Sequence, residues 1–379
     1  MDSVRRGTLI NLATRLAGVG LVLAITAVTA RIGTEAQGAF ALFTSVEGVL
    51  LALLSGFGIA LARRVSHHGE QPAALVSATV ICCALLGSVA GIGLWGVSAL
   101  GPPAYRWLWL LALGAPALLL APNLVGLWLG EGRMAPMARL NVAPPLVTLA
   151  LLLLALGVTV PSLPLVLASW VVAKVLVGAL AVALLWRGGR LAAPDWAALR
   201  REVPFIATIG ASNLVGLLNY RVGLFVIERV LGLSATGVYS IAVVMAELLW
   251  FVSGSLTQAV YGRIGTPDRS QAAATTVRVV QLGVAALVLV APLLWAAAWL
   301  LVPRVLGPAY ADSLPLLALL LPGVLLFGGA GALSAYFTNH AGRPQVPAQV
   351  ATLSLAVNGV LALGLVLLLG LAGAALAAS

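Results

Sequence analysis

The sequence predicts an all-α integral membrane protein with about twelve membrane-spanning helices, arranged as two six-helix lobes around a central cavity. Three observations predict this fold: an apolar composition, apolar runs of spanning length, and a partial repeat between the two halves. Hydrophobic residues make up 61% of the 379 residues, and charged residues only 8%. A soluble domain is roughly 25% charged, so this chain has too few polar side chains to cover a water-facing surface.

Apolar runs of spanning length divide the whole chain. A hydrocarbon core of ~30 Å needs about 20 residues of helix. A twelfth run begins after the turn Gly370–Gly373 and stops at Ser379, so we interpret the twelfth helix as truncated. The eleven complete spans are predicted near 8–30, 38–61, 73–99, 105–130, 136–160, 163–186, 204–230, 235–261, 276–301, 313–338 and 347–369.

Connections between the spans are short, and one of the two longest follows helix six. We therefore divide the chain into an N-terminal six-helix lobe (1–186), a cytoplasmic linker (187–203) and an incomplete C-terminal lobe (204–379). No separate soluble domain is predicted, because no stretch between the runs is long enough to bury a core.

The two halves share a turn. Gly33 and Gly38 lie between helices one and two, and the same spacing recurs at Gly232 and Gly237 between helices seven and eight. Helices one and seven both begin on the same side, so the repeat is parallel. Two parallel lobes with a site at their interface are a known plan of transporters.

The loop arginines predict the orientation, because cytoplasmic loops carry an excess of Arg and Lys. Of the 21 basic residues, fourteen fall in inner loops when the N-terminus is placed in the cytoplasm. Only four then fall outside, namely Arg31, Arg106, Arg229 and Arg304. The sequence leaves the oligomeric state open, with a monomer favoured.

Three basic residues remain inside the spans. Lys174 lies about 12 residues from either end of helix six, which is ~18 Å of helix rise and too deep to snorkel. Arg221 lies nearer the outer side. Arg15 is also assigned to the substrate cavity, with snorkelling to the nearby inner end as the alternative. For Lys174 and Arg221 two interpretations stay open: each lines a substrate cavity, or each belongs to a structural ion pair.

Two acids, Glu47 in helix two and Glu247 in helix eight, lie on polar stripes that occupy nearly equivalent places in the two lobes. Gln258 continues the stripe of helix eight, and Asn213 lies on a polar face of helix seven. We assign Asn213 and Gln258 to the cavity and keep the glutamates as candidates for coupling to protons or sodium. The alternative is interhelical hydrogen bonding that holds the bundle together.

Other chemistry is not indicated. The positive charges are scattered singly at helix ends, which argues against nucleic acid as a partner. The histidines lie on predicted loops and the adjacent cysteines lie in an apolar run, so no metal site and no cofactor are expected. A phosphate-binding loop and a nucleophile motif are absent from the sequence.

Three segments carry a family resemblance. Leu218–Ile264, Val305–Gln345 and Ala30–Ser45 resemble polysaccharide-exporting flippases of the multidrug/oligosaccharidyl-lipid/polysaccharide exporter superfamily. The resemblance implies a bacterial cytoplasmic membrane protein with a cationic cavity for the diphosphate of a polyprenyl carrier. Arg221 matches the motif Asn-Tyr-Arg of these relatives. Many of them carry an acid where this chain has Gly223, and this departure argues against an ion-coupling role at that position.

The favoured function is therefore the flipping of polyprenyl-diphosphate-linked oligosaccharide to the outer leaflet by alternating access. The alternative is a cation-coupled multidrug exporter of the same superfamily, which is expected to line its cavity with acids and aromatic rings. A membrane-embedded glycan polymerase or ligase is less favoured, because such an enzyme needs a large outer loop. We thus expect a transporter that is not an enzyme, with the bilayer and an anionic lipid-linked glycan as its partners.

Overall fold

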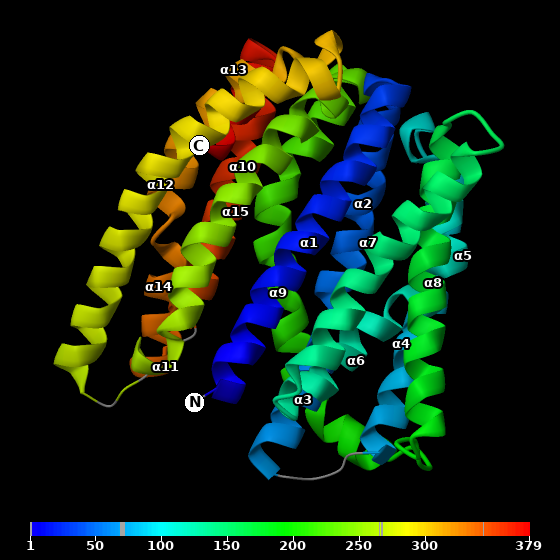
Figure 1. Ribbon diagram of the computed structural model, residues 1–379, viewed down its shortest axis with the longest axis vertical. Coiled ribbons are helices and arrows are strands. Elements are labelled where there is room, and N and C mark those ends of the chain that lie inside the picture. The colour runs from blue at the N-terminus through cyan, green and yellow to red at the C-terminus, as the bar shows by residue number, and fades with distance from the viewer. Residues whose placement is uncertain (1, 69–72, 265, 267, 344) are drawn as a thin grey trace. The chain divides into compact units, whose positions relative to one another are not determined.

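The computed structural model describes residues 2–68, 73–264, 266, 268–343 and 345–379; among these, the side chains of 2–12, 15, 67, 68, 252, 258, 259, 261, 262 and 339 are outside the description. Helices are the only regular structure in the described part (Figure 1). They are α1 (Asp2–Ile32), α2 (Thr34–Leu54), α3 (Gly56–His68), α4 (Ala73–Leu100), η1 (Pro103–Tyr105), α5 (Leu108–Leu118), α6 (Leu120–Gly130), α7 (Met134–Leu156), α8 (Leu163–Arg187), α9 (Trp196–Leu231), α10 (Leu233–Ala259), α11 (Tyr261–Ile264), α12 (Arg269–Val305), η2 (Pro308–Tyr310), α13 (Ser313–Phe327), α14 (Ala330–Ala335), η3 (Tyr336–His340), α15 (Gln345–Leu369) and α16 (Leu371–Ala378).

Within the described residues, nine helical segments are long and apolar enough to cross a membrane. They coincide with nine of the eleven predicted spans, and the other two predictions fall in α1 and α9. The all-α membrane fold is therefore confirmed, and the chain is a multi-pass integral membrane protein. Helices are required because hydrocarbon offers no partners for backbone N–H and C=O groups.

Several helices extend beyond their predicted ends. We expected helix seven to begin at residue 204, but α9 begins at Trp196 and contains Pro204 in its interior. Its first turns bury Leu199 and place Glu202 beside Arg64, with 2.9 Å between Nε and Oε1. Apolarity marks only the part of a helix inside the bilayer, so this polar first section was missed.

The described chain forms two compact units. The first comprises residues 1–32 and 42–217, and the second comprises 33–41 and 218–379. The start of α2 therefore belongs to the second unit, and α9 contributes to both.

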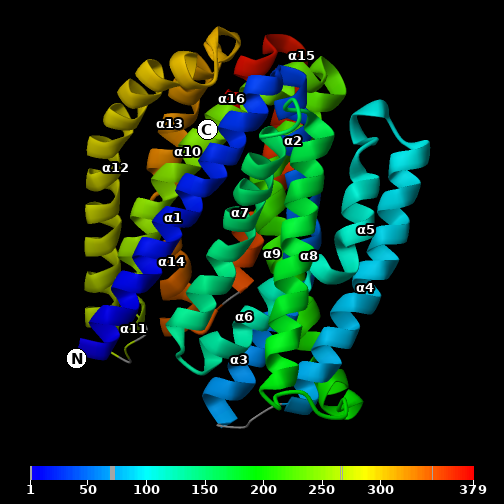
Figure 2. The ribbon, with the colours of Figure 1, turned by 45° about the vertical axis from the view of Figure 1, so that its right-hand side comes forward.

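In the first unit, α1 packs along α7, α4 along α5, and α3 along α6, while α8 contacts α5, α6 and α7 (Figures 1 and 2). Helices α3 and α6 approach each other closely, since a Cβ on Gly126 would lie 1.9 Å from the Gly58 carbonyl oxygen. Asn123 fixes this crossing, because its Oδ1 accepts from the Gly58 N–H at 2.9 Å and its Nδ2 donates to the Leu119 carbonyl.

In the second unit, α10 packs on α12 and α13, and its beginning crosses the beginning of α2. Gly38 and Gly237 meet there: a Cβ on either would lie 2.0 Å from a backbone oxygen of the other segment. Thr34 and Ser234 share a hydrogen bond of 2.7 Å, and Gln37 Nε2 donates to Ser240 Oγ at 3.1 Å. The second glycine of each repeated turn, Gly38 and Gly237, thus lies against the other.

Asp268 is the N-cap residue of α12. Its carboxylate accepts from the Ser270 hydroxyl at 2.7 Å and from the backbone N–H groups of Ser270 and Gln271. The Ser270 hydroxyl first, and then these N–H groups, hold the pKa of Asp268 below its ordinary value. The group therefore contributes stability above pH ~4, and this contribution disappears as the pH falls through the lowered pKa.

We accordingly expect Asp268→Ala to lower the thermal unfolding temperature of the protein at pH 7, because α12 loses its cap. The difference from the wild type should shrink as the pH is lowered below ~4. Thermal unfolding of both proteins in detergent over this pH range measures the effect. A difference that stays constant with pH would contradict the carboxylate's role.

Candidate substrate site

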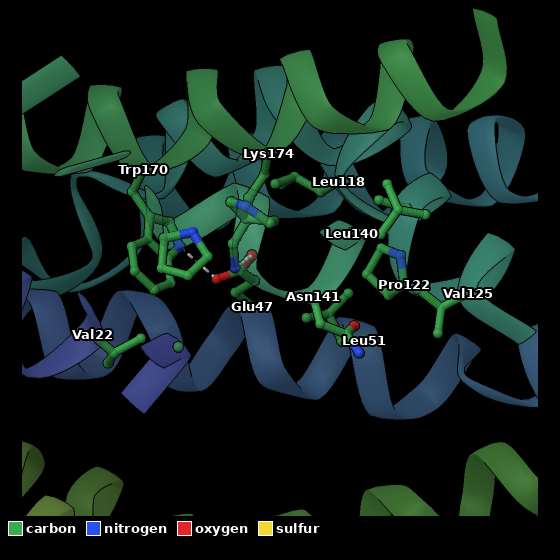
Figure 3. Close-up of a pocket in the computed structure, with 14 residues that line it drawn as sticks. Val22, Glu47, Leu51, Leu118, Pro122, Val125, Leu140, Asn141, Trp170 and Lys174 are labelled. Atoms are coloured by element: carbon green, nitrogen blue, oxygen red, sulfur yellow. Dashed lines mark hydrogen bonds and ion pairs between the residues drawn. The ribbon is translucent and has the colours of Figure 1, made fainter. Parts of the chain in front are cut away.

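A cavity of about 290 Å³ lies inside the first unit, with walls from α1, α2, α5, α6, α7 and α8. Its lining is mostly apolar, and Glu47 and Lys174 are its charged residues (Figure 3). Pro122, Pro144 and Pro145 also line it. A proline has no backbone N–H, so α7 lacks two helical hydrogen bonds beside the cavity, whereas Pro122 lies in the first turn of α6.

Glu47 and Lys174 form an ion pair in this cavity. The Lys174 ammonium donates to Glu47 Oε1, and the Trp170 indole N–H donates to Glu47 Oε2 at 2.7 Å. Lys174 Nζ also lies 4.3 Å from the centre of the Trp170 ring, so the ring face supplies a cation–π contact. Figure 3 shows Trp170 and Lys174 reaching from α8 toward Glu47 on α2.

Burial differs between the partners. The Glu47 side chain is 4% exposed, whereas that of Lys174 is 18% exposed. Both carboxylate oxygens have donors, but the ammonium carries three protons and gives one to Glu47. The arrangement can therefore fix an ammonium at a cavity wall with donors left for a ligand.

The second unit contains a second deep ion pair. Arg221 on α9 and Glu247 on α10 face each other in a two-pronged geometry, with Nη1–Oε1 at 3.1 Å and Nη2–Oε2 at 3.3 Å. Each side chain is about a quarter exposed. Glu47 on α2 thus takes its cation from α8, whereas Glu247 on α10 takes its cation from α9.

Glu247 also lines a cavity of about 480 Å³ within the second unit, walled mainly by α9, α10, α13, α15 and α16, with α12 and α14 contributing one and two residues. Its surface is largely apolar, with aromatic rings on one side and asparagine and serine on another. Gly223, at the position where the sequence resemblance would place an acid, also lines this cavity. A Cβ added at Gly223 would lie 3.3 Å from the Tyr239 hydroxyl. The acid nearest Arg221 therefore comes from α10.

The predicted site residues have different outcomes. Lys174 lies in an ion pair and also lines a cavity, so its geometry fits each of the two interpretations. Asn213 donates to Ser55 Oγ at 2.7 Å, where α2 passes into α3, and it lines neither of the two cavities. The side chains of Arg15 and Gln258 fall outside the described residues.

The sequence reasoning missed Trp170 and the amide cluster of Asn219, Ser354 and Asn358. Trp170 lies four residues before Lys174 on α8, which places both on one helix face. Ser354 and Asn358 have the same spacing inside the apolar run of α15. Their sequence signal is a pair of polar or aromatic residues four positions apart within a membrane-spanning helix.

The described residues contain no group of three or more His, Cys, Asp or Glu side chains that could hold a metal ion. His340, expected on a solvated loop, is half-buried, and its Nδ1 lies 2.8 Å from the Thr266 carbonyl oxygen.

Several solved membrane-protein structures have the same fold as this chain. The lipid II flippase MurJ in an inward closed conformation has a TM-score of 0.76 at 12% identity, over 98% of this chain and 84% of that one. An inward-facing MATE multidrug resistance transporter of the MOP superfamily has a TM-score of 0.75 at 17% identity, and the match covers 98% of this chain and 93% of that one.

A MOP-superfamily transporter from Pyrococcus furiosus has a TM-score of 0.63 at 15% identity, and the match covers 98% of this chain and 89% of that one. That transporter is described as having a binding pocket of reversed polarity. No known protein-family profile matches the chain. No curated protein matches it in sequence. The fold of the multidrug/oligosaccharidyl-lipid/polysaccharide exporter superfamily, indicated by the sequence resemblance, is confirmed.

Proposed function

We propose that this chain, which has the MOP-superfamily fold, is a membrane transporter that flips polyprenyl-diphosphate-linked oligosaccharide to the outer leaflet of a bacterial cytoplasmic membrane. The observation that carries the proposal is the Lys174 ammonium, held by Glu47 at the wall of a cavity at membrane depth. Ionisable residues within membrane-spanning helices are rare and costly, and this supports a functional role for the pair.

The diphosphate of the carrier would bind where donors are available. An ammonium offers a strong point charge, and a guanidinium offers paired hydrogen bonds to phosphate oxygens. Lys174 and Arg221 supply one of each, and Arg15 adds a third deep positive charge in the sequence. The acids within the spans are Glu47 and Glu247. The spans therefore carry an excess of one positive charge, which favours an anionic substrate.

Glu47 and the diphosphate would compete for Lys174. Substrate binding would release Glu47 from its cation, and the released carboxylate could take up a proton or a sodium ion. Glu247 would have the same role beside Arg221. Ion coupling through these acids is therefore part of the proposal, with alternating access as the transport cycle.

The alternative is a cation-coupled multidrug exporter. Its support is the second unit's cavity, where Glu247 lies near aromatic rings. That carboxylate already has a two-pronged guanidinium partner, which reduces its attraction for an organic cation. We propose no enzymatic activity for either site.

Reconstitution into proteoliposomes tests the function. A fluorescent polyprenyl-diphosphate oligosaccharide is added, and a lectin outside the vesicles reports how much glycan is accessible. We expect the protein to equilibrate the glycan between leaflets, whereas empty liposomes should leave it on its original side. Uptake of ethidium without movement of the glycan would instead support the multidrug exporter.

The orientation gives a separate prediction: the N-terminus and the segment before α9 face the cytoplasm. Ala192 and Ser162 are both exposed and lie on opposite sides of the predicted bilayer. In a background with Cys82 and Cys83 replaced by alanine, we expect Ser162→Cys to react with an impermeant maleimide on intact cells and Ala192→Cys to react only after lysis. Labelling of Ala192→Cys on intact cells would reverse the orientation.

A further inference from the structure

The second unit's cavity has an aromatic wall assembled from three helices. The Tyr220 and Trp250 rings have centroids 4.4 Å apart, and Phe327 lies 6.1 Å and 6.3 Å from them. All three residues line the cavity, from α9, α10 and α13. Rings grouped in this way offer a broad apolar surface with polar edges from Tyr and Trp.

Another wall of the same cavity carries a cluster of amides. Asn219 Nδ2 donates to Ser354 Oγ at 3.0 Å, and Asn358 Nδ2 donates to the Asn219 carbonyl oxygen at 2.8 Å. Ser354 and Asn358 lie near the middle of α15, one of the spanning helices. Such groups are unfavourable in hydrocarbon, so a cavity that receives a polar ligand explains their position.

Two polar atoms on these walls are left without partners. Trp250 Nε1, a donor, and Asn358 Oδ1, an acceptor, are buried and form no hydrogen bond with any described residue. A buried polar group without a partner is destabilising, and such groups are rare in folded proteins. The cavity therefore presents one unused donor and one unused acceptor together with an aromatic surface.

We propose that this cavity binds a sugar ring of the transported glycan; the inference rests on the proposed function and names the part of the substrate that the second unit recognises. The C–H face of a sugar ring packs on aromatic rings, and its hydroxyl groups both donate and accept hydrogen bonds.

Two other ligand classes fit less well. A polyprenyl chain would satisfy the aromatic wall but would leave the amides and the indole N–H unpaired. An organic cation would suit the rings, but Glu247, the acid in this lining, is already paired with Arg221. A neutral ligand with many hydroxyl groups uses every polar feature of the cavity.

Saturation-transfer NMR on the full chain in nanodiscs tests the inference, with methyl glycosides of glucose, galactose, rhamnose and N-acetylglucosamine as probes. We expect at least one glycoside to bind. Asn358→Leu should weaken its binding about tenfold, because a side chain of similar size loses the amide. Trp250→Leu should weaken it at least as much by removing the largest ring.

The matched control is Trp299→Leu, since Trp299 is 60% exposed on α12 of the same unit and does not line the cavity. It should leave glycoside binding unchanged. The inference is overturned if no glycoside binds, or if the control weakens binding as much as the cavity variants do. It is also overturned if tetraphenylphosphonium binds in place of the glycosides and the cavity variants weaken that binding. Thermal unfolding of each variant identifies any that fails to fold, and Asn358→Leu is the milder of the two.

The transport assay separates this inference from the proposed function. If the lipid-linked oligosaccharide crosses the bilayer but no glycoside binds, the sugar site is wrong and the flippase stands. If glycosides bind but the lipid-linked oligosaccharide stays on its original side, the flippase is wrong and the sugar site stands.

Discussion

Lys174→Ala is expected to lower the free energy of unfolding by about 3–5 kcal/mol and to reduce glycan flipping at least a hundredfold. The stability loss follows because Glu47 is almost completely buried and, among the side chains that the structure describes, would keep the Trp170 N–H as its one hydrogen-bond donor. Removing one member of a buried ion pair typically has an effect of ~3–5 kcal/mol. The transport loss follows because the cavity would lose its fixed cation.

A double variant separates the two effects. Lys174→Met with Glu47→Gln removes both charges and keeps similar volumes, and replacing a whole buried pair is often neutral or stabilising. We therefore expect the double variant to unfold near the wild-type temperature while flipping stays lost. Lys174→Arg keeps the charge and should retain part of the activity.

Thermal unfolding in detergent and lectin accessibility in proteoliposomes measure the two quantities independently. Recovery of flipping in the double variant would mean that Lys174 and Glu47 are only a structural pair. Wild-type flipping by a well-folded Lys174→Ala protein would also remove Lys174 from the site.

Gly38→Ala is expected to destabilise the second unit by about 3 kcal/mol, near the upper end of the usual effect of overpacking. The added Cβ would lie 2.0 Å from the Leu233 carbonyl oxygen and 3.0 Å from the Gly237 nitrogen. Both are backbone atoms, so no side-chain rotation can relieve the overlap. The beginnings of α2 and α10 must separate, which strains the Thr34–Ser234 and Gln37–Ser240 hydrogen bonds.

Gly93→Ala is the matched control. Gly93 lies inside α4 and has no heavy atom within 4 Å of the added Cβ. Alanine is favoured over glycine in a helix interior by ~1 kcal/mol, so this variant should be as stable as the wild type or more so. Equal unfolding temperatures for the two variants would show that the α2–α10 crossing tolerates a side chain.

Gly237→Ala should resemble Gly38→Ala, because its Cβ would lie 2.0 Å from the Thr34 carbonyl oxygen. The two substitutions act on one crossing, so their effects are not expected to add. Once either has separated the helices, the second finds less overlap. An additive double variant would indicate two independent contacts.

The sequence by itself determined the membrane fold and the positions of most spans. Apolar runs of spanning length leave a chain few alternatives, because a helix satisfies its own backbone hydrogen bonds in hydrocarbon. Lys174, Glu47, Arg221 and Glu247 also stood out, since a charge within an apolar run is visible without a structure. Helix ends beyond the bilayer were less visible, as the early start of α9 at Trp196 illustrates.

Only the tertiary structure decided which charges meet. Glu47 and Lys174 are 127 residues apart, and periodicity along a helix carries no information about the helix that packs against it. Glu47 and Glu247 occupy similar places in the two halves, yet their cations lie on α8 and α9. The Tyr220, Trp250 and Phe327 wall likewise exists only because three helices pack together, since ring-to-ring contacts depend on side-chain distances that the sequence does not specify.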